Sequence, residues 1–460
     1  MTLNGNIMKY CLEKGEILIS FLLIALESMF RICTVILPSP LRNWFYEQSK
    51  KVYSYFLPEL LVDDNANKLT DARDTIDLCA LHGYDLEEHF VRTTDGYLLG
   101  LHRVYKKKKG KIEELNYLPP VLFIHGLMMN SESWVCNLKK EDAIPFALVE
   151  QGYDVWLGNL RGNKYSIKNI KFSSQNPKFW DFSLDSIAIF DIPSIVKYIL
   201  SVNSFDSISL VGFSQGAILA FAALSIDTEL RNSVRAFIAL APAIAPKKYS
   251  GRTVKSIIHA NSQLLYLMFG RNSMLGSAVF WQAVLYPPVF AKIVDLFLRF
   301  FLSWTGKNIS ETQKIVAYSH LYSFTSVKCF VHWAQITRRK VLQMYDDSPG
   351  FKPSYYTNLN RIARYPIENI RLPITLVYGS NDNMVDIETL KTQLPPLSQC
   401  IQIPNYEHLD IIMGDTKKDI VIQQVVEQLN HVIAGDYFES IKEEFGLDTE
   451  LVDGVMNHTI

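Results

Sequence analysis

The residues with the clearest chemical potential in this sequence are a serine and its neighbours, in the segment Gly212–Gly216, which reads Gly-Phe-Ser-Gln-Gly. The apolar run Ile208–Val211 precedes it, and an alanine-rich stretch to Leu224 follows it. This order predicts a strand, a tight turn and a helix, with the hydroxyl of Ser214 raised clear of the sheet. Small residues on either side of the serine let the strand and the helix approach closely. Ser214 is therefore the predicted nucleophile.

A serine hydroxyl is a weak nucleophile until a neighbouring base accepts its proton. In folds with this strand–turn–helix element, an acid and then a histidine follow the serine along the chain. Asp382 is the predicted acid, since it comes shortly after the apolar run Pro373–Tyr378. His408 is the predicted base, in the segment Asn405–Asp410 after another apolar run. Both follow expected strands, at the edge of a parallel sheet where ligands bind.

Two other residues compete for these roles. Asp386 follows Asp382 closely enough in the sequence to serve as the acid, and His431 is a rival base in an expected C-terminal helix. Both alternatives stay open at the level of sequence.

The oxyanion that forms on an attacked ester carbonyl needs backbone N–H donors. One donor is expected from Gln215, directly after the nucleophile. The other is expected from Leu127, in the loop that follows the expected strand Val121–Ile124. Together these residues predict acyl transfer through a covalent intermediate on the serine, with a histidine as the base.

The sequence offers no recognisable metal or cofactor site. It has no His-Glu-x-x-His segment, and its ten histidines show no ligand-like spacing with cysteines or carboxylates. The phosphate-binding patterns GxGxxG and GxxxxGK(S/T) are also absent. We therefore expect the chemistry to need neither a metal ion nor a cofactor.

Short apolar runs alternate with helical stretches from Pro120 onward, which predicts an α/β fold whose central sheet is mostly parallel, with helices on both faces. Before this part, the alternation around Asp95-Gly96 predicts a hairpin between His89 and His102. The expected parallel strands are Val121–Ile124, Tyr153–Leu157, Ile208–Val211, Ala236–Leu240 and Pro373–Tyr378.

Residues 244–368 break this rhythm, since they are helical in pattern and dense in large apolar side chains such as those of Leu296–Leu302. They are either ordinary core or a lid whose inner face lines a lipid pocket, and we favour the lid. The expected organisation is a membrane anchor at 1–40, a linker with a short helical approach at 41–80, the first part of the core at 81–243, a helical cap at 244–368, the second part of the core at 369–435, and a C-terminal tail at 436–460.

The N-terminal segment is the candidate for membrane attachment. Residues Ile17–Leu26 are apolar apart from Ser20, and apolar character resumes at Ile32–Leu37 after the charged Glu27 and Arg31. The stretch is long enough to cross a bilayer, which takes about 20 residues. No small-x-small cleavage site follows it, which disfavours a signal peptide. A spanning helix, a monotopic insertion and a helix buried in the folded domain remain open, and we predict membrane attachment.

Composition narrows the class of protein. The chain has 460 residues, 48% of them hydrophobic, and a net charge of -1, with no basic face, so nucleic acid is not an expected partner. The six cysteines are scattered singly, without a CxxC pair. We therefore expect reduced thiols and a catalytic domain that faces the cytosol.

A set of motifs resembles the acid lipase family of α/β-hydrolases, in family order and spacing from about residue 75 to 435. The motifs are His82–Tyr84, Arg92–Tyr97, His125–Leu127, Gly152–Asn159, Arg161–Asn163, Gly212–Gly216 and Asn405–Asp410. The resemblance implies the α/β-hydrolase fold. It also implies Ser214, Asp382 and His408 as the triad, with oxyanion donors at Leu127 and Gln215, in agreement with the residue-by-residue prediction.

Within that family, the chain looks most like the fungal steryl ester hydrolases of lipid droplets. The N-terminal apolar segment and the segments Phe179–Phe182 and Ser326–Trp333 carry this likeness. It implies hydrolysis of sterol–fatty acid esters, and in some members of triacylglycerols, at a lipid droplet or endoplasmic reticulum membrane. Ile124 departs from the pattern, because many relatives have a second histidine there. Cys329 is the only cysteine of the expected cap, so the cap disulfide of secreted members has no counterpart.

Three other functions stay open, one of which is a soluble esterase for small substrates. A triacylglycerol lipase would use the same residues and differ in pocket shape. A catalytically inactive tether on lipid droplets would need none of them, and the intact serine, acid and histidine motifs argue against it.

Overall fold

A computed structural model describes residues 38–56, 64–106, 112–247, 252–274, 276–348, 362–395, 398–416 and 419–434. The predicted tail and almost all of the predicted anchor lie outside these ranges. Within them, no helix combines the length and the apolar character that crossing a membrane requires.

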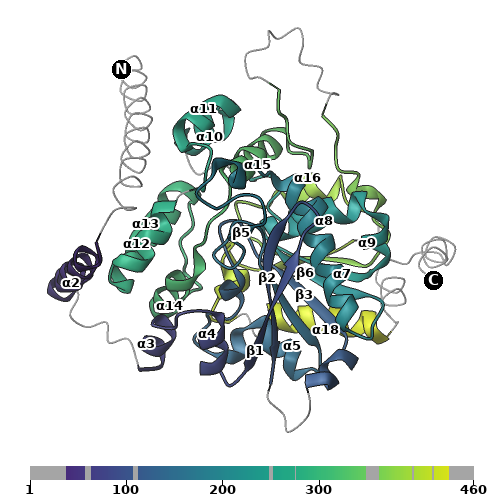
Figure 1. The fold of residues 1–460 in the computed structure, drawn as a ribbon, viewed down its shortest axis with the longest axis horizontal. Helices are drawn as coiled ribbons and strands as arrows, with labels where there is room; N and C mark the ends of the chain where they lie inside the picture. Colours follow the sequence, from purple (N-terminus) through teal and green to yellow (C-terminus); the bar gives the residue numbers. More distant parts are fainter. Residues whose placement is uncertain are drawn as a thin grey trace.

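A mixed nine-stranded sheet forms the centre of the molecule (Figure 1). Its order is β1-β2-β4-β3-β6-β7-β8-β9, with the short β5 beside β2. Neighbours from β4 to β9 run parallel, while β2 is antiparallel to β1, β4 and β5. The strands are β1 Asp85–Arg92, β2 Tyr97–Tyr105, β3 Pro120–Ile124, β4 Asp154–Gly158, β5 Lys168–Asn169, β6 Ile208–Phe213, β7 Val234–Leu240, β8 Ile374–Gly379 and β9 Gln399–Ile403.

Two hydrophobic cores lie on opposite faces of this sheet, because successive side chains of a strand point to opposite sides. In β3, Leu122 packs into the core with α7 and α8, while Phe123 packs into the core with α5 and α18. The strands β3, β4 and β6 are buried along their whole length, which explains why they read as continuous apolar runs. The helices of the core are α5 Ile144–Glu150, α6 Leu184–Ser186, α7 Ile192–Val202, α8 Gln215–Ile226, α9 Thr228–Asn232, α16 Ile387–Lys391, α17 Asp410–Met413 and α18 Val421–Ala434, with a π-helical turn, Ile187–Asp191, before α7.

The chain between β7 and β8 leaves the sheet and forms a set of helices. These helices are α10 Arg252–His259, α11 Ser262–Phe269, α12 Gly276–Val284, α13 Pro287–Leu302, α14 Glu311–Leu321 and α15 Val327–Arg339. They gather beside one end of the sheet, on the left and at the top in Figure 1. The helical pattern read from the sequence over this stretch therefore corresponds to helices in the structure.

The segment at 41–80, expected as a linker and a short helical approach, is largely helical in the structure. It contains α2 Ser39–Phe56, α3 Asp64–Thr70 and α4 Thr75–Leu81. Ala66, Leu69 and Leu78 are fully buried, and α3 lies against α14 of the cap while α4 lies against β1. The partner of α3 is distant in the sequence, so the local pattern of that helix did not reveal its burial, whereas the partner of α4 follows it closely.

A buried ion pair holds the loop after β4. The guanidinium of Arg161 donates to Asp191 on one side and to Asp95 on the other, with Nε 2.7 Å from Asp191 Oδ1 and Nη2 3.0 Å from Asp95 Oδ1. Asp191 is completely buried. The loop therefore joins the β1–β2 hairpin to the helix α7 that packs under it.

Candidate active site

Ser214 sits on a sharp turn between β6 and α8. It is a non-glycine residue with positive φ, at φ 53° and ψ −113°, a conformation that costs about 1–3 kcal/mol and persists where the surrounding structure enforces it. Its backbone N–H donates to the carbonyl of Leu240 on β7 at 2.8 Å. A side chain at Gly216 would place its Cβ only 2.2 Å from the carbonyl oxygen of Ile124. Glycine at this position lets α8 begin directly against β3.

The structure brings the predicted serine, histidine and acid into one hydrogen-bonded chain. His408 Nε2 lies 2.8 Å from Ser214 Oγ, and His408 Nδ1 lies 2.7 Å from Asp382 Oδ2. Asp382 follows β8 and His408 follows β9, so both come from loops at the carboxyl ends of parallel strands. All three side chains are buried, with 8% or less of each residue exposed.

This geometry assigns a role to each nitrogen of the imidazole. Asp382 Oδ2 accepts from His408 Nδ1–H, which leaves Nε2 free to accept the hydroxyl proton of Ser214. The other carboxylate oxygen, Oδ1, accepts the backbone N–H of Met384 at 2.7 Å. The acid is thus tied at both oxygens, which fixes the plane in which the histidine is held.

The rival residues lie in other contacts. Asp386 is the N-cap of α16, where its carboxylate accepts from the Thr389 hydroxyl at 2.8 Å and from Lys340 Nζ at 2.8 Å. His431 lies in the last turn of α18. Neither takes part in the hydrogen-bonded chain that joins Ser214, His408 and Asp382.

The two predicted oxyanion donors follow neighbouring strands, since Leu127 lies in the loop after β3 and Gln215 comes directly after the serine at the end of β6. Gln215 is the first residue of α8, so its N–H belongs to the unpaired first turn of a helix, where an anion is favoured. Among the described residues, no acceptor is bonded to the backbone N–H of Gln215 or of Leu127. Both groups are therefore available to a developing negative charge.

His125 holds the loop that carries one of these donors, a role that the sequence reading missed. The Gly126 carbonyl accepts from His125 Nδ1–H at 2.9 Å and from the Met129 N–H at 3.3 Å. That carbonyl shares a planar trans peptide with the N–H of Leu127, so holding the oxygen directs the N–H the opposite way. His125 Nε2 accepts from the Leu160 N–H at 3.2 Å, which requires the neutral ring. Burial lowers the pKa of His125 to about 4.

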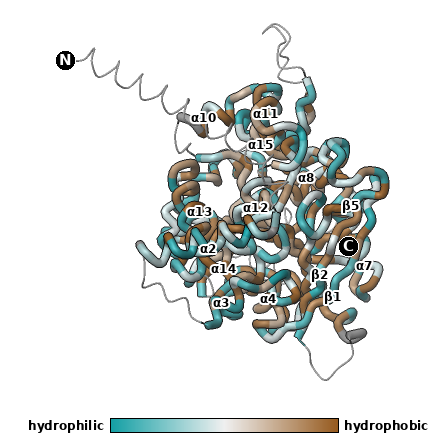
Figure 2. Tube along the Cα trace, turned by 60° about the vertical axis from the view of Figure 1, so that its left-hand side comes forward, coloured by the Kyte–Doolittle hydropathy of each residue, from teal (hydrophilic) through white to brown (hydrophobic). Residues whose placement is uncertain are grey.

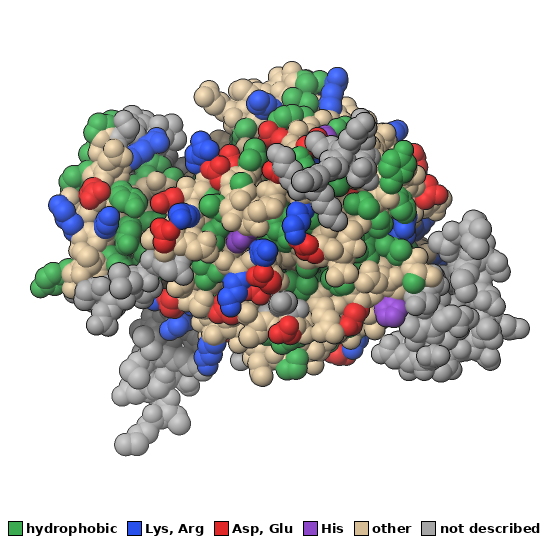
Figure 3. All heavy atoms as spheres, turned by 90° about the horizontal axis from the view of Figure 1, so that it is seen from below, with side chains coloured by type: hydrophobic (Ala, Val, Ile, Leu, Met, Phe, Trp, Pro, Cys, Tyr) green, Lys and Arg blue, Asp and Glu red, His purple; other side chains and the backbone are tan. Residues whose placement is uncertain are grey.

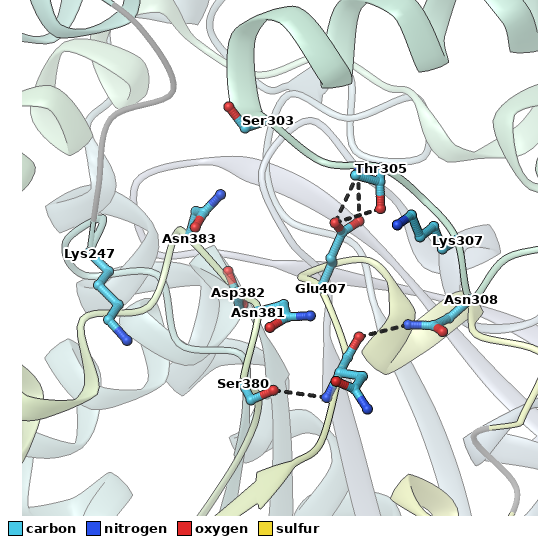
Figure 4. A pocket seen from close by; sticks show the side chains of 11 residues that line it. Lys247, Ser303, Thr305, Lys307, Asn308, Ser380, Asn381, Asp382, Asn383 and Glu407 are labelled. Carbon is cyan, nitrogen blue, oxygen red and sulfur yellow. Dashed lines mark hydrogen bonds between the residues drawn. The ribbon is translucent and has the colours of Figure 1, made fainter.

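The segment after α13 contacts the histidine loop, and this too was not foreseen. Trp304 stacks on the His408 ring, with centroids 5.1 Å apart and planes 17° from parallel. The Thr305 N–H donates to the Glu407 carboxylate at 2.8 Å (Figure 4), and the Gly306 N–H donates to the same carboxylate at 2.8 Å. Asn308 Nδ2 donates to the Asn405 carbonyl at 2.9 Å. These pairs lie about a hundred positions apart in the chain, so no local sequence pattern reports them.

A cavity of about 800 Å³ opens beside Asp382 and Glu407 (Figure 4). Its lining is rich in lysine, hydroxyl and amide groups, from Lys247, Ser303, Thr305, Lys307, Asn308, Ser380, Asn381, Asn383 and Asn405, together with the carboxylates of Asp382 and Glu407. Such a lining does not suit a sterol or an acyl chain, which need apolar walls. We therefore do not assign this cavity to the substrate.

The chain matches two descriptions of known families. Residues 75–138 match the partial alpha/beta-hydrolase lipase region, and residues 119–415 match the alpha/beta hydrolase fold. The second match spans more than half of the chain and includes every residue of the site described above.

Three similar proteins are named as lipases. A probable lipase of Schizosaccharomyces pombe is 39% identical over 427 residues, covering 93% of this chain and 96% of its own. Gastric triacylglycerol lipase of Rattus norvegicus is 32% identical, covering 75% of this chain and 89% of its own. Lysosomal acid lipase/cholesteryl ester hydrolase of the same organism is 33% identical, covering 71% and 84%.

Proposed function

This chain belongs to the α/β-hydrolase family and is one of its lipases, and from that premise we propose that it hydrolyses steryl esters to free sterol and fatty acid with a serine, histidine and aspartate triad. The observation that carries the proposal is the chain of hydrogen bonds from Asp382 through His408 to the hydroxyl of Ser214. Such a chain activates a serine for attack on an ester carbonyl.

In the proposed mechanism, His408 Nε2 takes the proton of Ser214 while Oγ attacks the carbonyl carbon. The negative charge on the carbonyl oxygen is stabilised by the N–H groups of Leu127 and Gln215. His408 then gives its proton to the departing sterol oxygen, which leaves the acyl group on the serine. A water molecule, deprotonated by the same histidine, releases the fatty acid. Asp382 keeps the histidine in the required tautomer and stabilises its cation throughout.

The name of one relative supports the steryl ester as substrate, since the rat lysosomal enzyme is a cholesteryl ester hydrolase as well as a lipase. The large apolar residues of the cap favour a bulky, apolar substrate over a small soluble ester. The second candidate is a triacylglycerol lipase, which the gastric relative favours. The two candidates share the triad and differ in the shape of the substrate site.

An inactive tether is a poorer interpretation of the site. A tether would not need Ser214 in a strained backbone conformation, nor a histidine whose two ring nitrogens contact the acid and the hydroxyl. Strain of this kind is retained where it serves a function.

We place the protein on the surface of lipid droplets or the endoplasmic reticulum, attached through residues 1–40, with the catalytic domain in the cytosol. The apolar runs in 17–26 and 32–37 support the attachment. The free thiols of Cys79, Cys329 and Cys400 are compatible with a reducing compartment.

The test is hydrolysis of cholesteryl oleate and trioleoylglycerol, presented separately as emulsions, by the full chain and by Ser214→Ala. We expect sterol release by the native chain and loss of that release in the variant. Activity on trioleoylglycerol alone would keep the triad and move the substrate to triacylglycerols. Equal turnover by the native chain and the variant on either ester would overturn the serine mechanism.

A further inference from the structure

The longest helix of the cap has two apolar faces, and only one of them is used by the fold. The inner face of α13 is buried through Phe290, Ala291, Val294 and Leu298. A second row of apolar side chains points outward, namely Ile293 at 50% exposed, Leu296 at 69%, Phe297 at 45% and Phe300 at 54%. These positions follow the i, i+3, i+4, i+7 spacing of a single helix face. The row is therefore a continuous apolar stripe on the surface.

The charges of α13 suit an interface with lipid. Asp295, its only acidic residue, turns toward α14, where it bonds Lys314 Nζ at 3.0 Å and the Tyr318 hydroxyl at 3.2 Å. Arg299 is exposed beside the stripe, and so is Lys292, which is paired with Glu311 of α14. A helix with an apolar outer stripe and flanking basic residues is the type that lies in the plane of a lipid surface.

The neighbouring helix α2 extends this surface. It is joined to the cap by a hydrogen bond from the Tyr286 N–H to Ser49 Oγ at 2.9 Å and by an edge contact between Phe45 and Trp281. Its outward face carries a second row of exposed apolar residues, formed by Leu41, Trp44, Val52 and Tyr55. Tryptophan and tyrosine are the side chains that favour the boundary between lipid and water.

The two rows belong to helices that contact each other. In Figure 2, brown segments are frequent along α12 and α13, which lie beside α2. In Figure 3, green side chains gather at the left-hand end, where α2 lies in Figure 1. We refer to the stripe of α13 and the row of α2 together as the cap surface.

Two observations identify a lipid surface as the occupant. The first is the sequence that precedes α2. The apolar runs at 17–26 and 32–37 come before this helix, and the second run ends two residues before its first residue, Ser39. Any lipid that binds those runs must lie close to the start of α2. The second is the position of α13 relative to the site. Trp304, two residues after the end of this helix, stacks on His408. The exposed helix therefore borders the place where a lipid ester must arrive.

We propose that the cap surface is a lipid-docking face, which inserts the outer stripe of α13 and the row of α2 among the acyl chains of a lipid monolayer. The inference rests on the proposed hydrolysis of lipid esters and adds to it the surface through which the substrate reaches the serine. It assigns lipid contact to the folded cap itself, in addition to the attachment proposed for residues 1–40.

A photo-crosslinker reports the occupant directly. The full chain carries p-benzoylphenylalanine in place of Leu296, and a matched chain carries it in place of Ile226, which is 39% exposed at the end of α8. Both are irradiated on trioleoylglycerol droplets coated with phosphatidylcholine. We expect a lipid adduct at 296 and none at 226. A cross-linked dimer at 296, an adduct with residues 1–37, or equal lipid labelling at the two sites would each overturn the proposal.

A kinetic test separates docking from chemistry. Leu296→Ser combined with Phe300→Ser should lower turnover of droplet-borne esters about tenfold, equivalent to about 1.4 kcal/mol of apolar burial lost by the two side chains together. Turnover of soluble p-nitrophenyl butyrate should stay at the native level, as it should for Ile226→Ser on both substrates. Unchanged droplet turnover in the double variant would refute the docking face. A native chain that leaves p-nitrophenyl butyrate intact would refute the proposed hydrolysis instead, and the cross-linking result would stand apart from it.

Discussion

Replacing Asp382 with asparagine should abolish most of the activity while leaving the fold intact. In the native chain Asp382 Oδ1 accepts the Met384 N–H at 2.7 Å and Oδ2 accepts His408 Nδ1–H at 2.7 Å. An asparagine must turn its oxygen toward Met384, because its NH₂ group would otherwise meet another donor there. The NH₂ group then faces His408 Nδ1 and forces the ring proton onto Nε2. Once protonated, Nε2 can no longer accept the proton of Ser214.

The expected loss follows from that tautomer. The variant lacks both the correct base and the charge that stabilises the imidazolium, so kcat should fall about 10⁴-fold, equivalent to about 5 kcal/mol of transition-state stabilisation. The KM for a soluble ester should change little, since Asp382 is 3% exposed and sits behind the histidine. The assay is steady-state hydrolysis of p-nitrophenyl butyrate, with circular dichroism to show that the variant is folded.

Asp386→Asn is the matched control. Asparagine caps a helix as well as aspartate does, so α16 should remain capped, and the lost pair with Lys340 is solvent-exposed and worth less than about 1 kcal/mol. We expect kcat of this variant to stay within about twofold of the native value. Two results would refute the reasoning, namely a folded Asp382→Asn chain with more than about a tenth of native activity, or an equal loss in Asp386→Asn.

Two further predictions concern stability. Arg161→Met leaves Asp191 as an unpaired carboxylate that is completely buried, and the free energy of unfolding should fall by about 3–5 kcal/mol in urea titrations; a loss below about 1 kcal/mol would show that the pair is not worth what its burial implies. Burial lowers the pKa of His102 and of His125 to about 4, below the usual value of about 6.5, so between these pH values the unfolded chain binds protons that the folded chain does not. The free energy of unfolding should therefore fall as the pH drops from 6.5 to 4, by about 3 kcal/mol for each histidine. Above pH 6.5 these two histidines should no longer make the free energy of unfolding depend on pH. His102→Asn should lose less stability over that range than the native chain, and an identical loss would contradict the assignment.

Much of the sheet could be predicted because buried parallel strands leave a strong local pattern. The runs at 121–124, 208–211 and 236–240 became β3, β6 and β7, with ends shifted by a residue or two. The turn at Ser214 was predictable for the same local reason, since a strand must pass into a helix within a few residues there. The bounds of the short helices α3 and α4 were not predicted. The burial of α3 depends on α14, which is remote in the chain, whereas α4 packs against β1, which follows it closely.

The sequence by itself determined the order of the chemistry-bearing residues and the types of element that carry them, because strand and helix periodicity and the turn motif are local properties. Only the tertiary structure decided between Asp382 and Asp386, because the choice depends on which carboxylate meets His408 Nδ1 across the ends of β8 and β9. The same holds for His125, Trp304 and Glu407, whose contacts join loops that are far apart in the chain. Such contacts arise from the packing of the cap against the core, which no short stretch of sequence encodes.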